Sequence, residues 1–258
     1  MSDAWIRAIV ALPFGLGVGS FMTVAVSRLP RGESVVRPRS RCPSCGAEIG
    51  ARDNVPVLSW LLLRGRCRRC GERISVEYPL IELTTAALVV LAAIRYPNPW
   101  QAGLVGGLLA LMPGIALIDL RHRIIPNRLT YPSILLAAFV VLLAWSIGSA
   151  ANPARAGIGF LLYGGILFIV AVVSRGMGMG DVKLAALIGL VLGSLGLRFV
   201  GVAAAAAIVL GGLGGLVALG MGRGRKSAIP FGPYLAAGAV VAGLWGESIA
   251  SWYIGRFL

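Results

Sequence analysis

Long apolar runs constrain the fold of this chain more than any other feature of its sequence. About 20 apolar residues cross a bilayer as a helix, and we place runs of that kind at residues 4–26, 79–95, 99–119, 129–149, 156–175, 181–197, 199–221 and 229–254. Only 13% of the residues are charged, whereas about 25% is usual in soluble domains. We therefore expect an all-α, polytopic integral membrane protein with about eight transmembrane helices.

The basic residues are distributed unevenly between the two sides of these runs. The net charge is +14, from 24 lysines and arginines against 10 acids. If the N-terminus lies outside the cytoplasm, all but five basic residues fall on the cytoplasmic side, as the positive-inside rule requires. Those five are Arg7, Arg95, Arg155, Arg198 and Arg256. The basic charge therefore orients the chain, and we expect a lipid bilayer as its partner and no nucleic acid.

All four cysteines lie in residues 27–78, the one long polar segment, which this orientation puts in the cytoplasm. They form two C-x-x-C pairs, Cys42 with Cys45 and Cys67 with Cys70, and 21 residues separate the pairs. This is close to the spacing of a zinc ribbon. Four thiolates in a closed tetrahedron favour a structural Zn²⁺. The spacing therefore predicts a small cytoplasmic, zinc-ribbon-like segment.

Two disulfides are the alternative for these cysteines. Disulfides are rare in the reducing cytoplasm, where the charge distribution puts the segment. A segment of about 50 residues with few aliphatic side chains also has difficulty folding on its own core, and domains of that size usually need a metal or a disulfide. Metal binding is therefore the preferred interpretation.

Carboxylates are scarce in the rest of the chain. Between Glu82 and Glu247 there are only two, Asp119 and Asp181. Asp119 ends the third run and Asp181 opens the sixth, in GMGMGDVKL, so the topology brings both to the cytoplasmic ends of their helices. Ionisable groups at such positions are candidates for function. We expect Glu82 to lie close enough to the cysteine segment for contact, and Glu247 to lie nearer the outer side.

Two adjacent carboxyl groups cannot easily both ionise, so one keeps a proton. One can then activate water while the other protonates a leaving amine, which is aspartic-protease chemistry. The spacing alone leaves another interpretation open. Asp181 would then cap its helix through free backbone N–H groups, and Asp119 would pair with Arg121 or Arg123.

Five blocks of sequence resemble the type IV prepilin leader peptidases, which are also N-methyltransferases and are G-x-G-D membrane aspartic proteases. The blocks are GSFMTVAVSRLPRGES (19–34), SRCPSCGAEIGARDNVPVLSWLLLRGRCRRCGERISVEYPLIEL (40–83), IDLRHRIIPNRLTYP (118–132), GMGMGDVKLAALIG (176–189) and IPFGPYLAAGA (229–239). Two positions depart from the common pattern. Thr23 stands where many members have asparagine, and Asn127 where many have aspartate.

The resemblance implies a multi-pass enzyme of the bacterial inner membrane whose active sites face the cytoplasm. Such an enzyme cleaves the basic leader of a prepilin or pseudopilin and methylates the new N-terminus with S-adenosylmethionine. The family's catalytic aspartates fall on Asp119 and Asp181, and its tetracysteine falls on the four cysteines. The implied division is a first transmembrane helix (1–26), a cysteine segment associated with methylation (27–78) and a membrane aspartic peptidase domain (79–258).

Two other classes of function compete with this one. A cation-coupled transporter would use the two aspartates as a relay, but both are expected at one face, and only Glu247 lies toward the other. A non-catalytic zinc-ribbon scaffold would recruit a cytoplasmic partner through the cysteines, but it leaves the aspartates unexplained.

Overall fold

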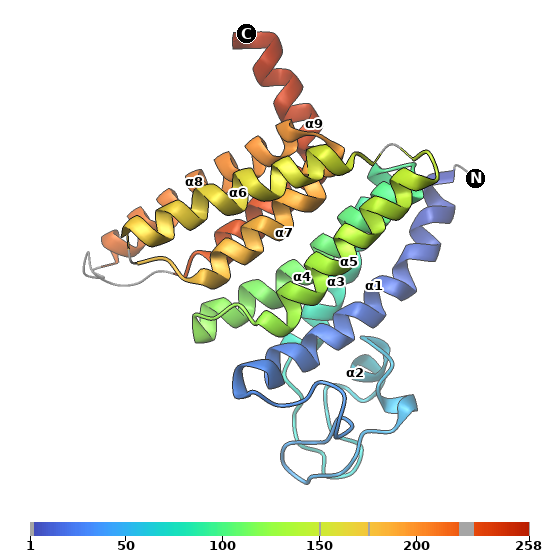
Figure 1. Cartoon of the computed structure of the whole chain (residues 1–258). Helices are drawn as coiled ribbons and strands as arrows, with labels where there is room; N and C mark the ends of the chain where they lie inside the picture. The colour runs from blue at the N-terminus through green and yellow to red at the C-terminus, as the bar shows by residue number, and fades with distance from the viewer. Residues whose placement is uncertain (1–2, 150, 175, 222–229, 258) are drawn as a thin grey trace.

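The computed structural model describes residues 3–149, 151–174, 176–221 and 230–257 (Figure 1). In these residues the chain forms eight long helices, α1 (Asp3–Arg28), α3 (Glu77–Arg95), α4 (Pro99–His122), α5 (Asn127–Ser146), α6 (Pro153–Ser174), α7 (Met179–Leu195), α8 (Leu197–Gly220) and α9 (Gly232–Phe257). Three short helical pieces lie between α1 and α3, namely η1 (Leu29–Arg31), η2 (Ala51–Asp53) and α2 (Leu58–Leu62).

Each of the eight expected spans corresponds to one long helix, and the described residues contain no strand beyond two isolated bridges. The all-α membrane fold is therefore confirmed. By length and composition, six of the described helices can cross a membrane: α1, α3, α4, α5, α6 and α8. The other two long helices are α7, with 17 residues, and α9, with 26. Residue 229, where the eighth expected span began, lies outside the described residues.

Small residues let the helices of the bundle approach one another closely. A Cβ atom at Gly15 of α1 would lie 2.8 Å from Ala86 Cα of α3. A Cβ atom at Gly19 would lie 2.7 Å from Glu82 Cα. Such close contacts at glycine are typical of helix packing in membranes, where dispersion replaces the hydrophobic effect between helices. They fix α1 against the part of α3 that begins beside the cysteine segment.

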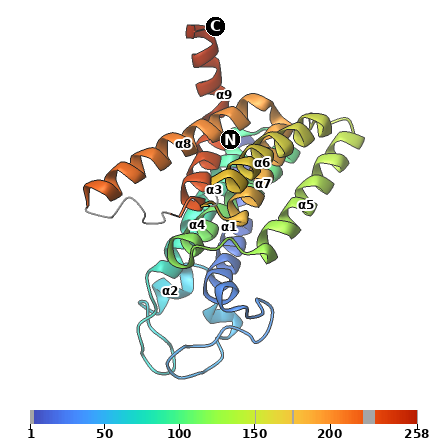
Figure 2. The ribbon, with the colours of Figure 1, turned by 60° about the vertical axis from the view of Figure 1, so that its left-hand side comes forward.

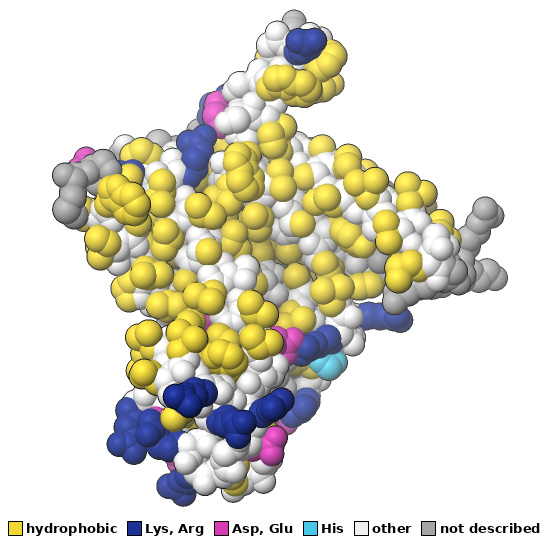
Figure 3. All heavy atoms as spheres, turned by 180° about the vertical axis from the view of Figure 1, so that it is seen from behind, with side chains coloured by type: hydrophobic (Ala, Val, Ile, Leu, Met, Phe, Trp, Pro, Cys, Tyr) yellow, Lys and Arg dark blue, Asp and Glu magenta, His cyan; other side chains and the backbone are white. Residues whose placement is uncertain are grey.

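The cysteine segment lies at one end of the helix bundle, below the helices in Figures 1 and 2. The N-terminal and C-terminal parts of the chain lie away from this segment. Figure 3 shows lysine and arginine side chains gathered around the cysteine segment, below a broad band of apolar side chains. This agrees with the uneven distribution of charge in the sequence. Four of the basic residues in that count, Arg175, Arg223, Arg225 and Lys226, lie outside the described residues.

Candidate active site and metal centre

The four cysteines meet in one cluster, as their spacing predicts. One Sγ atom from each of Cys42, Cys45, Cys67 and Cys70 lies within 4.8 Å of the other three, and the Cys42 and Cys70 sulfurs are 3.8 Å apart. Zn–S bonds of about 2.3 Å in a tetrahedron require sulfur–sulfur distances of about 3.8 Å. All four cysteines are free of disulfides. The cluster therefore has the ligands and the size of a structural zinc site.

Two matching turns hold the thiols in place. In the first, Cys42 N–H donates to Ala47 O (2.9 Å) and Gly46 N–H donates to Cys42 O (2.9 Å). In the second, Cys67 N–H donates to Glu72 O (2.8 Å) and the glycine after the pair donates to Cys67 O (2.9 Å). The two glycines have φ angles of 67° and 73°, in the left-handed region that favours glycine. The repeated turn explains why glycine follows each C-x-x-C pair.

The first turn also favours a thiolate at Cys42. Backbone N–H groups of Cys45 and Ser44 donate to the Cys42 sulfur and lower its pKa from 9.0 to about 6. Only the deprotonated form of cysteine ligates a metal. These backbone hydrogen bonds therefore favour the deprotonated form of Cys42, which is the form that binds a metal ion.

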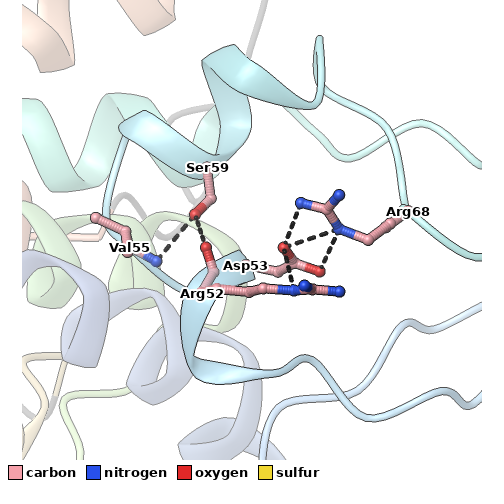
Figure 4. A network of polar contacts seen from close by, with 5 residues as sticks. All are labelled: Arg52, Asp53, Val55, Ser59 and Arg68. Atoms are coloured by element: carbon pink, nitrogen blue, oxygen red, sulfur yellow. Dashed lines mark hydrogen bonds and ion pairs between the residues drawn. The ribbon is translucent and has the colours of Figure 1, made fainter.

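A polar network joins the middle of the segment to the second turn (Figure 4). The Arg68 guanidinium donates to both carboxylate oxygens of Asp53, at 2.7 to 3.0 Å. This hydrogen bonding holds the pKa of Asp53 below its usual value. Nearby, Val55 N–H donates to the Ser59 hydroxyl, which donates to Arg52 O, each at 3.0 Å. The network ties η2 and the start of α2 to the cysteine cluster.

The two aspartates come together at one end of the helix bundle. Asp119 lies in the last turn of α4, and Asp181 lies in the first turn of α7. α4 and α7 are in contact, and a Cβ atom at Gly180, next to Asp181, would lie 2.9 Å from Ile125, which lies in the link that follows α4. The sequence predicts both residues at the cytoplasmic ends of their helices, one at the end of α4 and the other at the start of α7. The structure adds that the two helix ends adjoin.

Asp119 is buried, with 5% of its surface exposed, and α9 supplies its hydrogen-bond partner. Gly232 N–H, at the start of α9, donates to Asp119 Oδ2 at 2.9 Å. A Cβ atom at Gly232 would lie only 2.6 Å from that oxygen. The site is therefore built by three helix ends, those of α4, α7 and α9. Sequence reasoning missed Gly232, although it lies in the quoted block IPFGPYLAAGA.

The structure describes neither aspartate in the exact position that the alternative interpretation gave it. Gly178 occupies the N-cap position of α7, and Asp181 lies three residues further along, in the first turn. Asp181 Oδ1 is buried without a hydrogen-bond partner among the described residues. Arg121 pairs instead with Glu77 of α3, and no ion pair within the described ranges involves Asp119. Buried carboxylate oxygens usually have a hydrogen-bond partner. A water molecule or a substrate group that reacts at this site would be the partner of Asp181 Oδ1.

The start of α7 is fixed by contacts with the link between α4 and α5. A Cβ atom at Gly180 would lie 2.9 Å from Ile125 Cβ, so glycine is needed there for close packing. Lys183 Nζ donates to Asn127 Oδ1 at 2.8 Å and lies 4.9 Å from the centre of the Tyr131 ring. Asn127, one of the two departures from the common pattern, therefore helps to position the helix that carries Asp181.

The two glutamates lie at opposite ends of the bundle. Glu82 is buried, and its Oε2 accepts a hydrogen bond from Val57 N–H of the cysteine segment at 2.7 Å, so the expected contact with that segment is confirmed. Glu247 of α9 pairs with Arg198 of α8 at 2.7 Å. That ion pair removes the free third acid that a transporter would need.

We expect Gly232→Ala to lower the rate of catalysis at the aspartate pair by roughly 10²-fold, because the added methyl group pushes the Asp119 carboxylate away and small displacements of a reacting group cost about that much. Gly255→Ala is the matched control, because it changes the same helix where a Cβ atom meets open space. The prediction is checked by measuring the catalytic rates of both variants and the parent with equal amounts of membrane-inserted protein. Equal rates for the two variants would show that the contact does not position Asp119.

The fold and the site together define a polytopic membrane protein with a paired-carboxylate site and a separate tetracysteine centre. Residues 14–96 match the bacterial peptidase A24 N-terminal domain, and residues 104–219 match the type IV leader peptidase family. The chain belongs to the type IV leader peptidase family and is an enzyme.

Relatives of this chain resemble it over nearly its whole length. The prepilin leader peptidase/N-methyltransferase of Aeromonas hydrophila is 36% identical, covering 98% of this chain and 96% of the relative. The protein of the same name from Bacillus subtilis (strain 168) is also 36% identical, over 93% and 95% of the two chains. The type 4 prepilin-like proteins leader peptide-processing enzyme of Escherichia coli O78:H11 is 34% identical, over 90% and 91%. No solved structure matches the chain significantly.

Proposed function

We propose that this chain cleaves the basic leader peptide of a type IV prepilin or pseudopilin and then methylates the new N-terminal amine. The observation that carries the proposal is the pairing of Asp119 and Asp181 at one end of α4 and α7, in a chain of this family. The names of the relatives supply the substrate class and the second activity.

Cleavage follows from two adjacent carboxyl groups that share one proton. The ionised carboxylate removes a proton from water, and the water oxygen bonds to the scissile carbonyl carbon. The protonated carboxyl gives its proton to the leaving amine as the C–N bond breaks. Adjacent acids divide the roles of base and acid in this way. The Gly232 N–H keeps one oxygen of Asp119 in place during the reaction.

The basic leader is expected to approach from the cytoplasmic side, where basic side chains also gather. Some of the acids on that side already pair with arginines, since Glu48 pairs with Arg39 and Glu77 pairs with Arg121. Asp53 is held by Arg68. Two further acids, Glu33 and Glu72, form no ion pair with the residues that the structure describes. These two are therefore the acids best suited to attract a basic leader.

The second activity belongs to the cysteine segment in this proposal. Zn²⁺ held by the four thiolates stabilises residues 27–78, whereas residues 1–26 form the first transmembrane helix and residues 79–258 the peptidase domain. S-adenosylmethionine bound beside this segment would supply an electrophilic methyl group, and a C–N bond to the amine would form as the C–S bond breaks. The sulfur keeps the bonding electrons, and the amine loses one proton.

Incubation of the purified enzyme with a prepilin and S-adenosylmethionine tests the proposal. Mass spectrometry of the product N-terminus reads both activities in one sample. We expect a pilin that lacks its leader and carries one methyl group on its first residue. An intact leader after incubation would contradict the peptidase assignment, and a cleaved but unmethylated product would contradict the methyltransferase assignment.

A further inference from the structure

A cavity of about 490 Å³ lies between the cysteine segment and the helices α1 and α3. Thr23 of α1, Trp60 of α2 and Glu82 of α3 line it, together with Cys42 of the metal cluster. Sites for small molecules and cofactors usually have volumes of about 300–1,000 Å³. The cavity therefore has the size of a cofactor site, and its walls come from both the cysteine segment and the helix bundle.

The indole ring of Trp60 lines one wall of this cavity and is held in a fixed position. Its indole Nε1–H donates to Ile74 O at 3.1 Å. Its ring packs against Gly65, where a Cβ atom would lie 2.9 Å from Trp60 Cζ2, and Gly65 has a φ of 65°. Glycine is required at that position both for the close contact and for the backbone. A fixed indole ring that lines a cavity is suited to stack on a planar heterocycle.

The inner wall combines a buried carboxylate with a strained backbone. Glu82 is 8% exposed and accepts a hydrogen bond from Val57 N–H at 2.7 Å. Val57 has a φ of 62°, and Leu58 N–H donates to Pro56 O across it at 2.6 Å. A β-branched residue with positive φ is an outlier that persists only where its surroundings impose it, and such residues cluster at ligand sites. The hydrogen bond to Glu82 holds this residue against α3.

The rim of the cavity carries both signs of charge. Arg31, Arg41 and Arg73 are exposed and line it, and none forms an ion pair with another described residue. Glu33 and Glu72 line it from the same side. A ligand with both a carboxylate and cationic groups finds a partner here for each.

A second, smaller cavity lies between the larger one and the last turn of α4. It measures about 230 Å³ and shares Thr23, Ser27, Arg31 and Tyr78 with the larger one. Its far wall includes His122, which follows Asp119 by three residues at the end of α4.

We propose that the larger cavity binds S-adenosylmethionine, with Trp60 stacking on the adenine, the rim arginines receiving the carboxylate, and Glu82 facing the positive charge. This inference deepens the proposed function and rests on its methyltransferase half. Thr23 lies in the cavity wall with its hydroxyl bonded to Ser20 O at 2.7 Å. The departure at this position therefore belongs to the proposed cofactor site and leaves the aspartate pair unchanged.

Equilibrium binding of radiolabelled S-adenosylmethionine to the purified, zinc-loaded full chain is the first test. We expect Trp60→Ala to weaken binding by about 10-fold or more, because loss of stacking on a base costs roughly that much. Trp60→Phe, which keeps an aromatic ring, should retain most of the affinity. Trp145→Ala is the matched control, since that tryptophan is exposed on α5. Unchanged affinity in Trp60→Ala would overturn the assignment.

Photo-crosslinking with the unaltered chain gives a second test that does not depend on a variant folding. After irradiation with radiolabelled S-adenosylmethionine and digestion with trypsin, label is expected in the peptides 53–64 and 74–95, which carry Trp60 and Tyr78. Leader cleavage by the same preparation reports on the peptidase half. Label confined to other peptides overturns the cavity assignment and leaves the proposed function intact. A preparation that cleaves leaders but binds no S-adenosylmethionine would overturn both the cavity assignment and the proposed methyltransferase activity.

Discussion

Asp119→Asn and Asp181→Asn are each expected to lower the rate of leader cleavage by about 10³-fold or more, because each removes one of the two groups that move protons in the reaction. Asparagine has the same shape as aspartate, and its carbonyl oxygen still accepts the Gly232 N–H. Folding and membrane insertion should therefore survive both substitutions. Cleavage of a prepilin by equal amounts of membrane-inserted protein measures the effect.

Glu247→Gln is the matched control for these variants. It also neutralises one carboxylate in the helix bundle, but Glu247 pairs with Arg198 away from the aspartates. We expect it to cleave at nearly the parent rate. A rate near that of the parent in either aspartate variant would refute the assignment at that position, whereas equal losses in all three would point to a general effect of charge removal.

The Cys42→Ser, Cys45→Ser double variant is expected to lose its bound zinc and the fold of residues 27–78. Hydroxyl groups are poor substitutes for thiolates, and structural zinc sites in small domains contribute roughly 10–16 kcal/mol of binding free energy. Elemental analysis of the purified protein measures the metal. Limited proteolysis measures the order of the segment, because the backbone beside its exposed arginines fits into the active site of trypsin only when the segment unfolds.

Ser44→Ala is the control for the cysteine variant, since it alters the same turn without removing a ligand. It should retain one zinc ion per chain and resist trypsin like the parent. Stoichiometric zinc in the doubly substituted protein would contradict the four-thiolate site. Loss of zinc in both variants would show that the turn, rather than the thiolates, is the sensitive element.

The helices and the cysteine cluster could be predicted because each depends on a local pattern. Apolar runs of membrane-spanning length gave all eight long helices, and the two C-x-x-C pairs with their following glycines gave the metal-sized cluster. The placement of Asp119 and Asp181 toward the same side of the membrane was also predictable, since it follows from alternating helix directions. These features need no knowledge of how the helices pack.

Other parts of the site depend on packing and could not be read from the sequence. The bond from Gly232 to Asp119 joins residues 113 positions apart. The bond from Val57 to Glu82, and the cavity beside it, appear only when the cysteine segment folds back on α1 and α3. The expected N-cap position of Asp181 differs for a local reason, because α7 begins at Met179 and Gly178 takes the cap position.

The central claim is that one chain holds two separate sites, an aspartate pair for cleavage and a cysteine-stabilised site for methylation. The most direct measurement gives an Asp119→Asn, Asp181→Asn double variant a mature, unmethylated pilin together with S-adenosylmethionine. Mass spectrometry then follows the first residue of the pilin. We expect the double variant to add one methyl group as the parent enzyme does, although it no longer cleaves a prepilin. An N-terminus that gains no methyl group from the variant, while the parent adds one under the same conditions, would contradict the separation of the two sites.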